Sequence, residues 1–148
     1  MRELPRELSA EALAELFEGR TRFVERLAGL ENPLDVAREV VLELSDEEKR
    51  EVLDAHPAIG AKRLSPRSAQ EQGADEDPAV LEELARLNGA YEEKFGFRFV
   101  VFVNRRPKSA ILPILRERLG RTRAAELETA LEELVSIAID RWHRAVSG

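Results

Sequence analysis

The sequence contains no cysteine, which excludes disulfides, thiolate metal sites and a cysteine nucleophile. It also has no apolar run that approaches the about 20 residues needed to cross a bilayer. The N-terminal segment is charged and lacks an apolar core, so it does not have the form of a signal peptide. These absences predict a cytoplasmic protein that does not interact with membranes.

Two kinds of functional motif are also missing. There is no glycine-rich phosphate loop, and the only two histidines, His56 and His143, are far apart and show no metal-ligand spacing such as HExxH. We therefore expect any chemistry to be acid–base work, with no metal and no cofactor. The net charge of −6 argues against nucleic-acid binding, which usually rests on a basic surface.

What remains is the composition of a soluble globular protein. The chain has 148 residues, of which 43% are hydrophobic and 35% charged, and this length fits one ordinary domain. Since no segment has the composition of an interdomain linker, we predict a single domain over residues 1–148.

Most of the chain has the periodicity and the boundary signals of amphipathic helices. Asn32 before Pro33 predicts a capped helix start, and Ser45 with Glu48 has the form of a capping box. Gly96 is expected to end the longest central helix. No repeated β pattern occurs, so the prediction is an all-α bundle of about seven to eight helices. Helices are expected to begin near residues 9, 23, 33, 45, 78, 109 and 122.

One segment differs from these helices. Residues 97–103, FRFVVFV, are aromatic and β-branched and have the composition of a strand. No partner strand is present, so we predict a buried extended segment, although the apolar character also fits the start of a helix. The residues that follow, 104–108, form a basic cluster, which we interpret as a solvated turn.

The stretch HPAIGAKRLSPRSAQEQG, residues 56–73, interrupts the helices with polar and backbone-restricting residues. His56 is the best single candidate for proton transfer near neutral pH, although a histidine at a helix end can simply bind the last carbonyls. Ser68, Glu71 and Gln72 have spacings that place them on one face of a helical turn. Ser-x-x-Glu is also a capping box, so a structural role for these residues stays open.

Arg141 is the third candidate, in a final helix whose other inward residues are apolar. Its spacing from Leu134 and Ala138 places it near the apolar side. An arginine there can bind a carboxylate or an oxygen-rich ring through two hydrogen bonds. It can also extend its head group to the edge of the core.

Five motifs follow one another along the chain. They are HPAIG at 56–60, SAQEQ at 68–72, LNGAYEEKFGFRFVV at 87–101, ILPILRERLG at 111–120 and ALEELVSIAIDRW at 130–142. Taken together and in this order, they resemble the 2-oxo-4-hydroxy-4-carboxy-5-ureidoimidazoline (OHCU) decarboxylase family. The resemblance covers residues 36–142, most of the chain.

The resemblance implies a role for particular residues. It makes His56 and Glu71 catalytic, with His56 as the proton donor or its close organiser. It places Pro57, Ser68, Gln72 and Arg141 in substrate binding, together with backbone groups after the Phe-Gly-Phe motif. Those backbone groups belong to Phe99, Val100, Val101, Phe102 and Val103.

The family resemblance also implies an activity. The expected enzyme is a cofactor-independent carboxy-lyase that converts OHCU, a small-molecule substrate, to (S)-allantoin in urate degradation, and it is commonly a homodimer. Two alternatives stay open at this point: a non-catalytic helical interaction domain, and a decarboxylase of the same fold that acts on a related ureido acid. Convergence of His56, Glu71 and Arg141 on one pocket would favour an enzyme.

Overall fold

The computed structural model describes residues 4–56, 77–104 and 106–147. Within these ranges the chain forms seven helices and no strand, which confirms the all-α prediction. The helices are α1 (Ala10–Leu16), α2 (Arg22–Ala28), α3 (Pro33–Leu42), α4 (Asp46–Asp54), α6 (Pro78–Phe95), α7 (Lys108–Leu119) and α8 (Arg123–Ser147).

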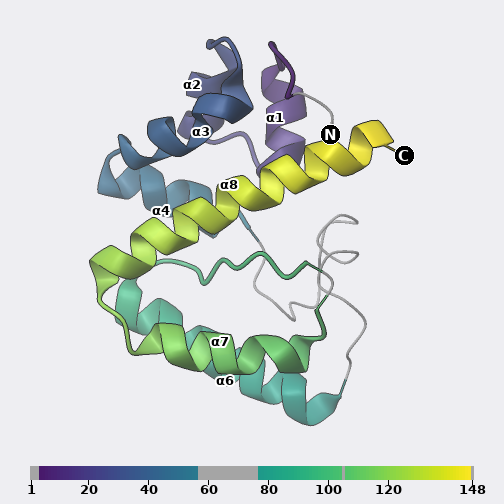
Figure 1. Ribbon diagram of the computed structural model, residues 1–148. Helices are drawn as coiled ribbons and strands as arrows, with labels where there is room; N and C mark the ends of the chain where they lie inside the picture. The colour runs from purple at the N-terminus through teal and green to yellow at the C-terminus, as the bar shows by residue number, and fades with distance from the viewer. Residues whose placement is uncertain (1–3, 57–76, 105, 148) are drawn as a thin grey trace.

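The long helix α8 divides the molecule (Figure 1). Helices α1 to α4 lie on one side of it, and α1, α3 and α4 pack directly against it. Helices α6 and α7 lie side by side on the other side. The two run in the same direction because residues 97–103 carry the chain back between them and α8.

The buried side chains of all seven helices form one hydrophobic core, and the 97–103 segment passes through it. Phe97, Phe99, Val100, Val101 and Val103 are all buried, so the predicted buried extended segment is confirmed. Phe97 and Phe99 pack edge-on against Tyr91 of α6, with ring centroids 5.8 and 5.2 Å apart. Aromatic side chains of this size carry much of the burial energy, which explains why a strand-like composition is stable here without a strand partner.

Local sequence signals account for most helix ends. The Ser45 Oγ accepts from the Glu48 N–H at 3.2 Å and the Glu48 carboxylate accepts from the Ser45 N–H at 3.1 Å, so the capping box is confirmed. Gly96 ends α6 with a positive φ of 79°. The predicted cap at Asn32 is wrong: that residue has a φ of 51° and its side chain caps nothing. Pro33 still begins α3, because its fixed φ suits the first helical position.

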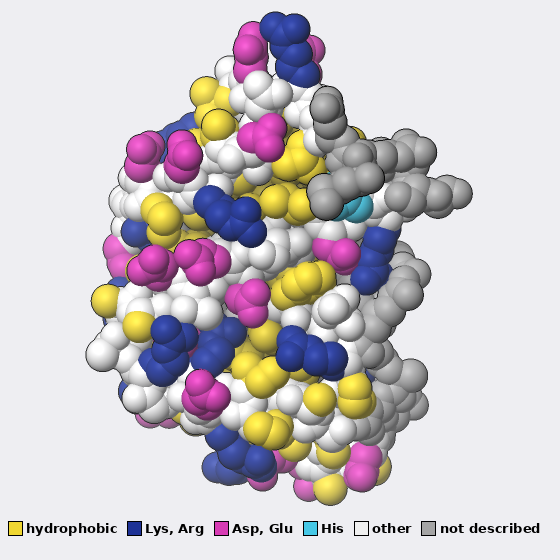
Figure 2. Space-filling model, in the orientation of Figure 1, with side chains coloured by type: hydrophobic (Ala, Val, Ile, Leu, Met, Phe, Trp, Pro, Cys, Tyr) yellow, Lys and Arg dark blue, Asp and Glu magenta, His cyan; other side chains and the backbone are white. Residues whose placement is uncertain are grey.

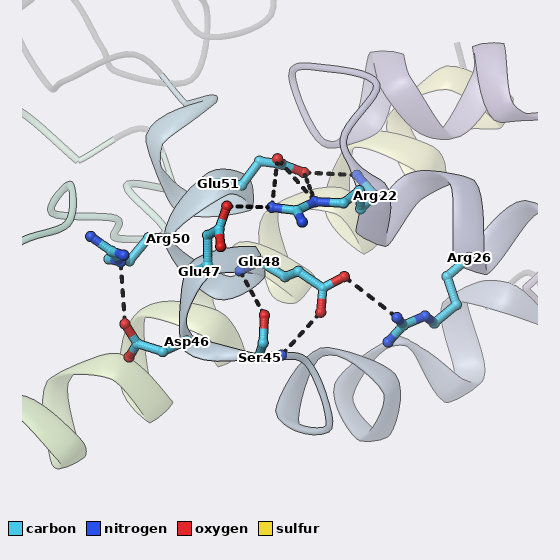
Figure 3. A network of polar contacts seen from close by, with 8 residues as sticks. All are labelled: Arg22, Arg26, Ser45, Asp46, Glu47, Glu48, Arg50 and Glu51. Atoms are coloured by element: carbon cyan, nitrogen blue, oxygen red, sulfur yellow. Dashed lines mark hydrogen bonds and ion pairs between the residues drawn. The ribbon is translucent and has the colours of Figure 1, made fainter.

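Helix α4 is fastened to α2 by a polar network (Figure 3). The Glu51 carboxylate accepts from the Arg22 backbone N–H at 2.8 Å and also pairs with the Arg22 guanidinium. Glu48 reaches Arg26 of the same helix α2 at 3.5 Å. Because the end of α4 leads directly to His56, these contacts help to fix where that histidine lies.

The surface carries both signs of charge. On the face drawn in Figure 2, acidic and basic side chains alternate and no large area of one sign is visible. Of the helices in the described ranges, none combines the length and apolar character that crossing a membrane requires.

Candidate active site

His56 lies immediately after α4, where its backbone N–H donates to the Leu53 carbonyl at 3.2 Å. Its own carbonyl accepts from the Arg98 guanidinium, so the position is fixed from two sides. The side chain is 5% exposed. Within the part of the chain that the structure describes, its Nε2 atom is buried and has no hydrogen-bond partner. A buried polar atom without a partner is costly, so this atom is a candidate to bind a ligand.

Burial lowers the pKa of His56 from 6.5 to about 3, because the charged imidazolium loses its solvation. The positive charge of Arg141 and, less strongly, that of Arg98 also lower this pKa, whereas the charge of Glu18 opposes them. The imidazole is therefore neutral at physiological pH. A neutral imidazole can accept a proton and then pass it on.

We expect this histidine to make the protein less stable in mild acid. Below pH 6.5 the unfolded chain binds a proton at His56 that the folded chain does not bind, so the free energy of unfolding falls as the pH falls towards 3. Between pH 7 and pH 5 the loss from this one group is about 2 kcal/mol. Urea unfolding at several pH values measures it. In a His56→Asn variant the loss over that interval should be smaller by this amount, and an unchanged loss would contradict the burial of a neutral imidazole.

Arg141 projects from α8 and is almost completely buried, with 2% of its surface exposed. Its Nη2 atom lies 3.0 Å from the Glu18 Oε1 atom, and its Nη1 atom donates to the Leu16 carbonyl at 3.2 Å. The guanidinium is thus tied to the C-terminal end of α1. Its positive charge also lowers the pKa of the His56 imidazole. Convergence of His56, Glu71 and Arg141 on one pocket stays a prediction, because Glu71 lies outside the described residues.

The extended segment is held in place by arginines that bind its backbone and the end of α4. Arg98 donates its backbone N–H to the Asp54 carboxylate at 3.0 Å. Arg118 of α7 donates to the Val100 carbonyl at 2.9 Å and lies over the Phe99 ring, 4.6 Å from its centroid. The segment that the family resemblance assigns to substrate binding is therefore fixed on both sides.

The basic cluster after this segment is more than a solvated turn, and that prediction is wrong in part. Lys108 is buried. Arg106 donates to the carbonyls of Phe102 and Val103, at 2.7 and 2.9 Å. Its guanidinium therefore satisfies the last two carbonyls of the extended segment, which have no partner strand in the described ranges to supply donors.

The described residues include only part of the predicted site. His56, Arg141 and the 99–103 segment are described, whereas Pro57, Ser68, Glu71 and Gln72 lie outside the described residues. The roles of those four stay predictions. Sequence reasoning missed Glu18 and Arg98, which both contact the predicted residues. The one available signal for Glu18 was its place directly before Gly19, at the end of a helix.

In the described ranges the fold is all-helical, and it buries a neutral histidine and an arginine that is tethered to the end of α1. Residues 2–143 match the model of the family described as OHCU decarboxylase. The chain belongs to the OHCU decarboxylase family, as the motifs indicated.

Individual relatives agree with this assignment. The 2-oxo-4-hydroxy-4-carboxy-5-ureidoimidazoline decarboxylases of Halalkalicoccus jeotgali and Haloferax volcanii are both 32% identical to it, over 66% and 68% of this chain. The matched regions span 58% and 63% of the length of those two relatives.

Two solved structures have the same fold. A crystal structure of OHCU decarboxylase in the presence of (S)-allantoin superimposes with a TM-score of 0.73 at 26% identity, over 85% of this chain and 91% of the other. A crystal structure of (S)-allantoin synthase gives a TM-score of 0.65 at 28% identity, over 93% of this chain and 48% of the other.

Proposed function

We propose that this protein decarboxylates OHCU to (S)-allantoin, as a cofactor-independent carboxy-lyase of urate degradation. The observation that carries the proposal is the buried His56, whose Nε2 atom lacks a described partner, together with the buried Arg141, whose charge lowers the pKa of this histidine. The names of the relatives and of the matching structures supply the substrate and the product. A non-catalytic interaction domain would have no need to bury these two groups together, since burying an unpartnered polar atom and a charge is costly.

The reaction can proceed without an added electron sink. When carbon dioxide leaves, the electron pair of the broken bond forms a double bond to the ureido-bearing carbon. The electrons of the adjacent C=N bond of the ring move to its nitrogen, which takes up a proton. The carbon that carried the carboxylate keeps its hydroxyl group, so the product of this step is an enol. A proton then leaves the hydroxyl oxygen and a proton is added to the ureido-bearing carbon, which gives the carbonyl of allantoin. Addition from one face sets the configuration.

A neutral His56 suits this transfer. It can accept the hydroxyl proton at its Nε2 atom and deliver a proton to carbon. The negative charge that the ring carries once carbon dioxide has left raises the pKa of the imidazole towards the range in which it does both. Arg141 holds the oxygen on which negative charge develops. From the family resemblance, Glu71 binds ureido or ring N–H groups. Pro57, Ser68, Gln72 and the backbone of residues 99–103 position the ring.

Production of optically active allantoin tests the function. OHCU is unstable, so it is generated in the assay by the two preceding activities of urate degradation. We expect optically active allantoin to appear at a rate proportional to the concentration of this protein, and only slow, racemic product without it. A related ureido acid serves as a second substrate. If that compound alone is consumed, the protein has the same fold and a different substrate, and the proposal for OHCU is wrong.

The finer aspects of the proposal rest on the family resemblance. We propose one domain over residues 1–148, a homodimer and a cytoplasmic location, with no metal and no cofactor. The continuous hydrophobic core supports the single domain, and the mixed surface charge in Figure 2 suits a small-molecule enzyme better than a nucleic-acid-binding protein. Light scattering should give a mass about twice that of the 16.7 kDa chain.

A further inference from the structure

Glu18 occupies a backbone position that usually takes glycine. The Gly19 N–H donates to the Ala14 carbonyl at 2.9 Å, which is the closing hydrogen bond of a Schellman motif at the end of α1. The residue before that donor adopts the left-handed conformation, and Glu18 has a φ of 62°. Among the described residues, the other non-glycine residues with positive φ are Asn32 and Asn104, and asparagine tolerates this region well.

Glu18 therefore has an unfavourable backbone conformation, although the next residue, Gly19, could adopt a positive φ without strain. Strained residues of this kind persist where their side chains have a function. The Glu18 side chain turns inwards, is only 12% exposed and lies 3.0 Å from Arg141. Without a carboxylate the buried guanidinium would be an uncompensated charge, which is strongly unfavourable.

The contact also reaches the catalytic histidine. Arg141 and Glu18 act on His56 with opposite signs, so all three groups lie in one electrostatic neighbourhood. Arg141 is held at two nitrogens, by Glu18 at Nη2 and by the Leu16 carbonyl at Nη1. Two fixed nitrogens and the attachment to the side chain at Nε together determine the plane of a guanidinium, and that plane decides which oxygens the group can bind.

We propose that Glu18 is a positioning residue that holds the Arg141 guanidinium in the orientation required beside His56. Its role in turnover rests on the proposed function. Its effect on Arg141 does not. Since Arg141 acts on charge that develops during the reaction, Glu18 should influence kcat more than KM.

The first test is Glu18→Gln, which removes the charge and keeps the shape. We expect kcat to fall by about 10- to 100-fold with little change in KM, since a small displacement of a catalytic group has effects of this size. In an Arg141→Met background, Glu18→Gln should cause no further fall, because Glu18 acts through Arg141. A further fall by the same factor in that background would overturn the proposal. Glu11→Gln, at an exposed position on α1, is the matched control and should behave as the wild type.

Glu18→Gly separates positioning from folding. Glycine suits a φ of 62°, so this variant relieves the backbone strain, but it leaves the buried Arg141 guanidinium without this carboxylate. It should fold with a lowered melting temperature, while kcat falls at least as far as in Glu18→Gln. Retention of full kcat by this variant would contradict the proposal.

A spectroscopic readout keeps the proposal testable if the wild type does not decarboxylate OHCU. In ¹H–¹⁵N spectra, a held Arg141 guanidinium should give separate Nη signals in the wild type and averaged signals in Glu18→Gln. Separate signals in both proteins would show that Glu18 does not hold the group. Separate signals lost in the variant, without activity in the wild type, would support the positioning role and refute only the proposed function.

Discussion

Replacing His56 with asparagine should lower kcat for OHCU by about 10²- to 10⁴-fold, the usual contribution of a general acid or base. Asparagine is polar and of similar size, but it cannot exchange a proton near neutral pH. KM should change much less, because the proposed substrate contacts with the 99–103 backbone remain. The measurement is the initial rate of formation of optically active allantoin at saturating OHCU.

His143→Asn is the matched control, since it makes the same change at the only other histidine. His143 follows Arg141 by two residues on α8, so its side chain leaves the helix about 200° away from that of Arg141. We expect near wild-type kcat for this variant. If His56→Asn turns OHCU over at the wild-type rate, His56 is not the acid–base group and the proposed mechanism is wrong.

Glu126→Ala should cause the largest loss of stability, about 3–5 kcal/mol in the free energy of unfolding. The Glu126 carboxylate is completely buried. It accepts from the Tyr91 hydroxyl at 2.6 Å and from Arg118 Nε at 2.7 Å, while its other oxygen accepts from Arg121 at 2.9 Å. Removing the carboxylate leaves the buried Arg118 guanidinium without its counter-ion, and urea unfolding measures the loss.

Two further variants show that the loss comes from an uncompensated charge. Glu128→Ala, at an exposed position on the same helix, should change stability by no more than about 0.5 kcal/mol. The double variant Glu126→Leu, Arg118→Met should be more stable than Glu126→Ala, because well-packed apolar residues can replace a buried ion pair. A loss below about 1 kcal/mol for Glu126→Ala would mean that the pair is poorly formed in solution.

This cluster also supports the candidate site. Arg118 binds Glu126 and, through another nitrogen, the carbonyl of Val100. Loss of the carboxylate therefore removes a contact that holds Arg118 in position to bind the extended segment. The backbone of that segment is proposed to position the substrate ring. Measuring KM for OHCU in the same variants therefore shows how strongly substrate binding depends on the position of the segment.

The sequence by itself determined most of the helices and the buried extended segment, and it predicted the burial of Arg141 near the apolar side of the last helix. These features depend on local chemistry: apolar periodicity, caps such as Ser45 with Glu48, and helix ends such as Gly96 are encoded within a few residues. The ordered motifs indicated the family, and the family match confirms it. The expected cap at Asn32 failed because that residue is left-handed and its backbone N–H instead meets the Arg6 carbonyl at 2.7 Å, a contact between separate segments.

Only the tertiary structure decided how the site is held. Glu18 and Arg141 are far apart in sequence, as are Arg98 and His56, and no local pattern records that such residues meet. The neutral state of His56 likewise depends on burial and on charges brought in by α8 and by the extended segment. Pairing and desolvation arise from packing between distant segments. The sequence could therefore propose His56 and Arg141 as candidates, and the fold was needed to show that the imidazole is buried and that Glu18 binds the guanidinium.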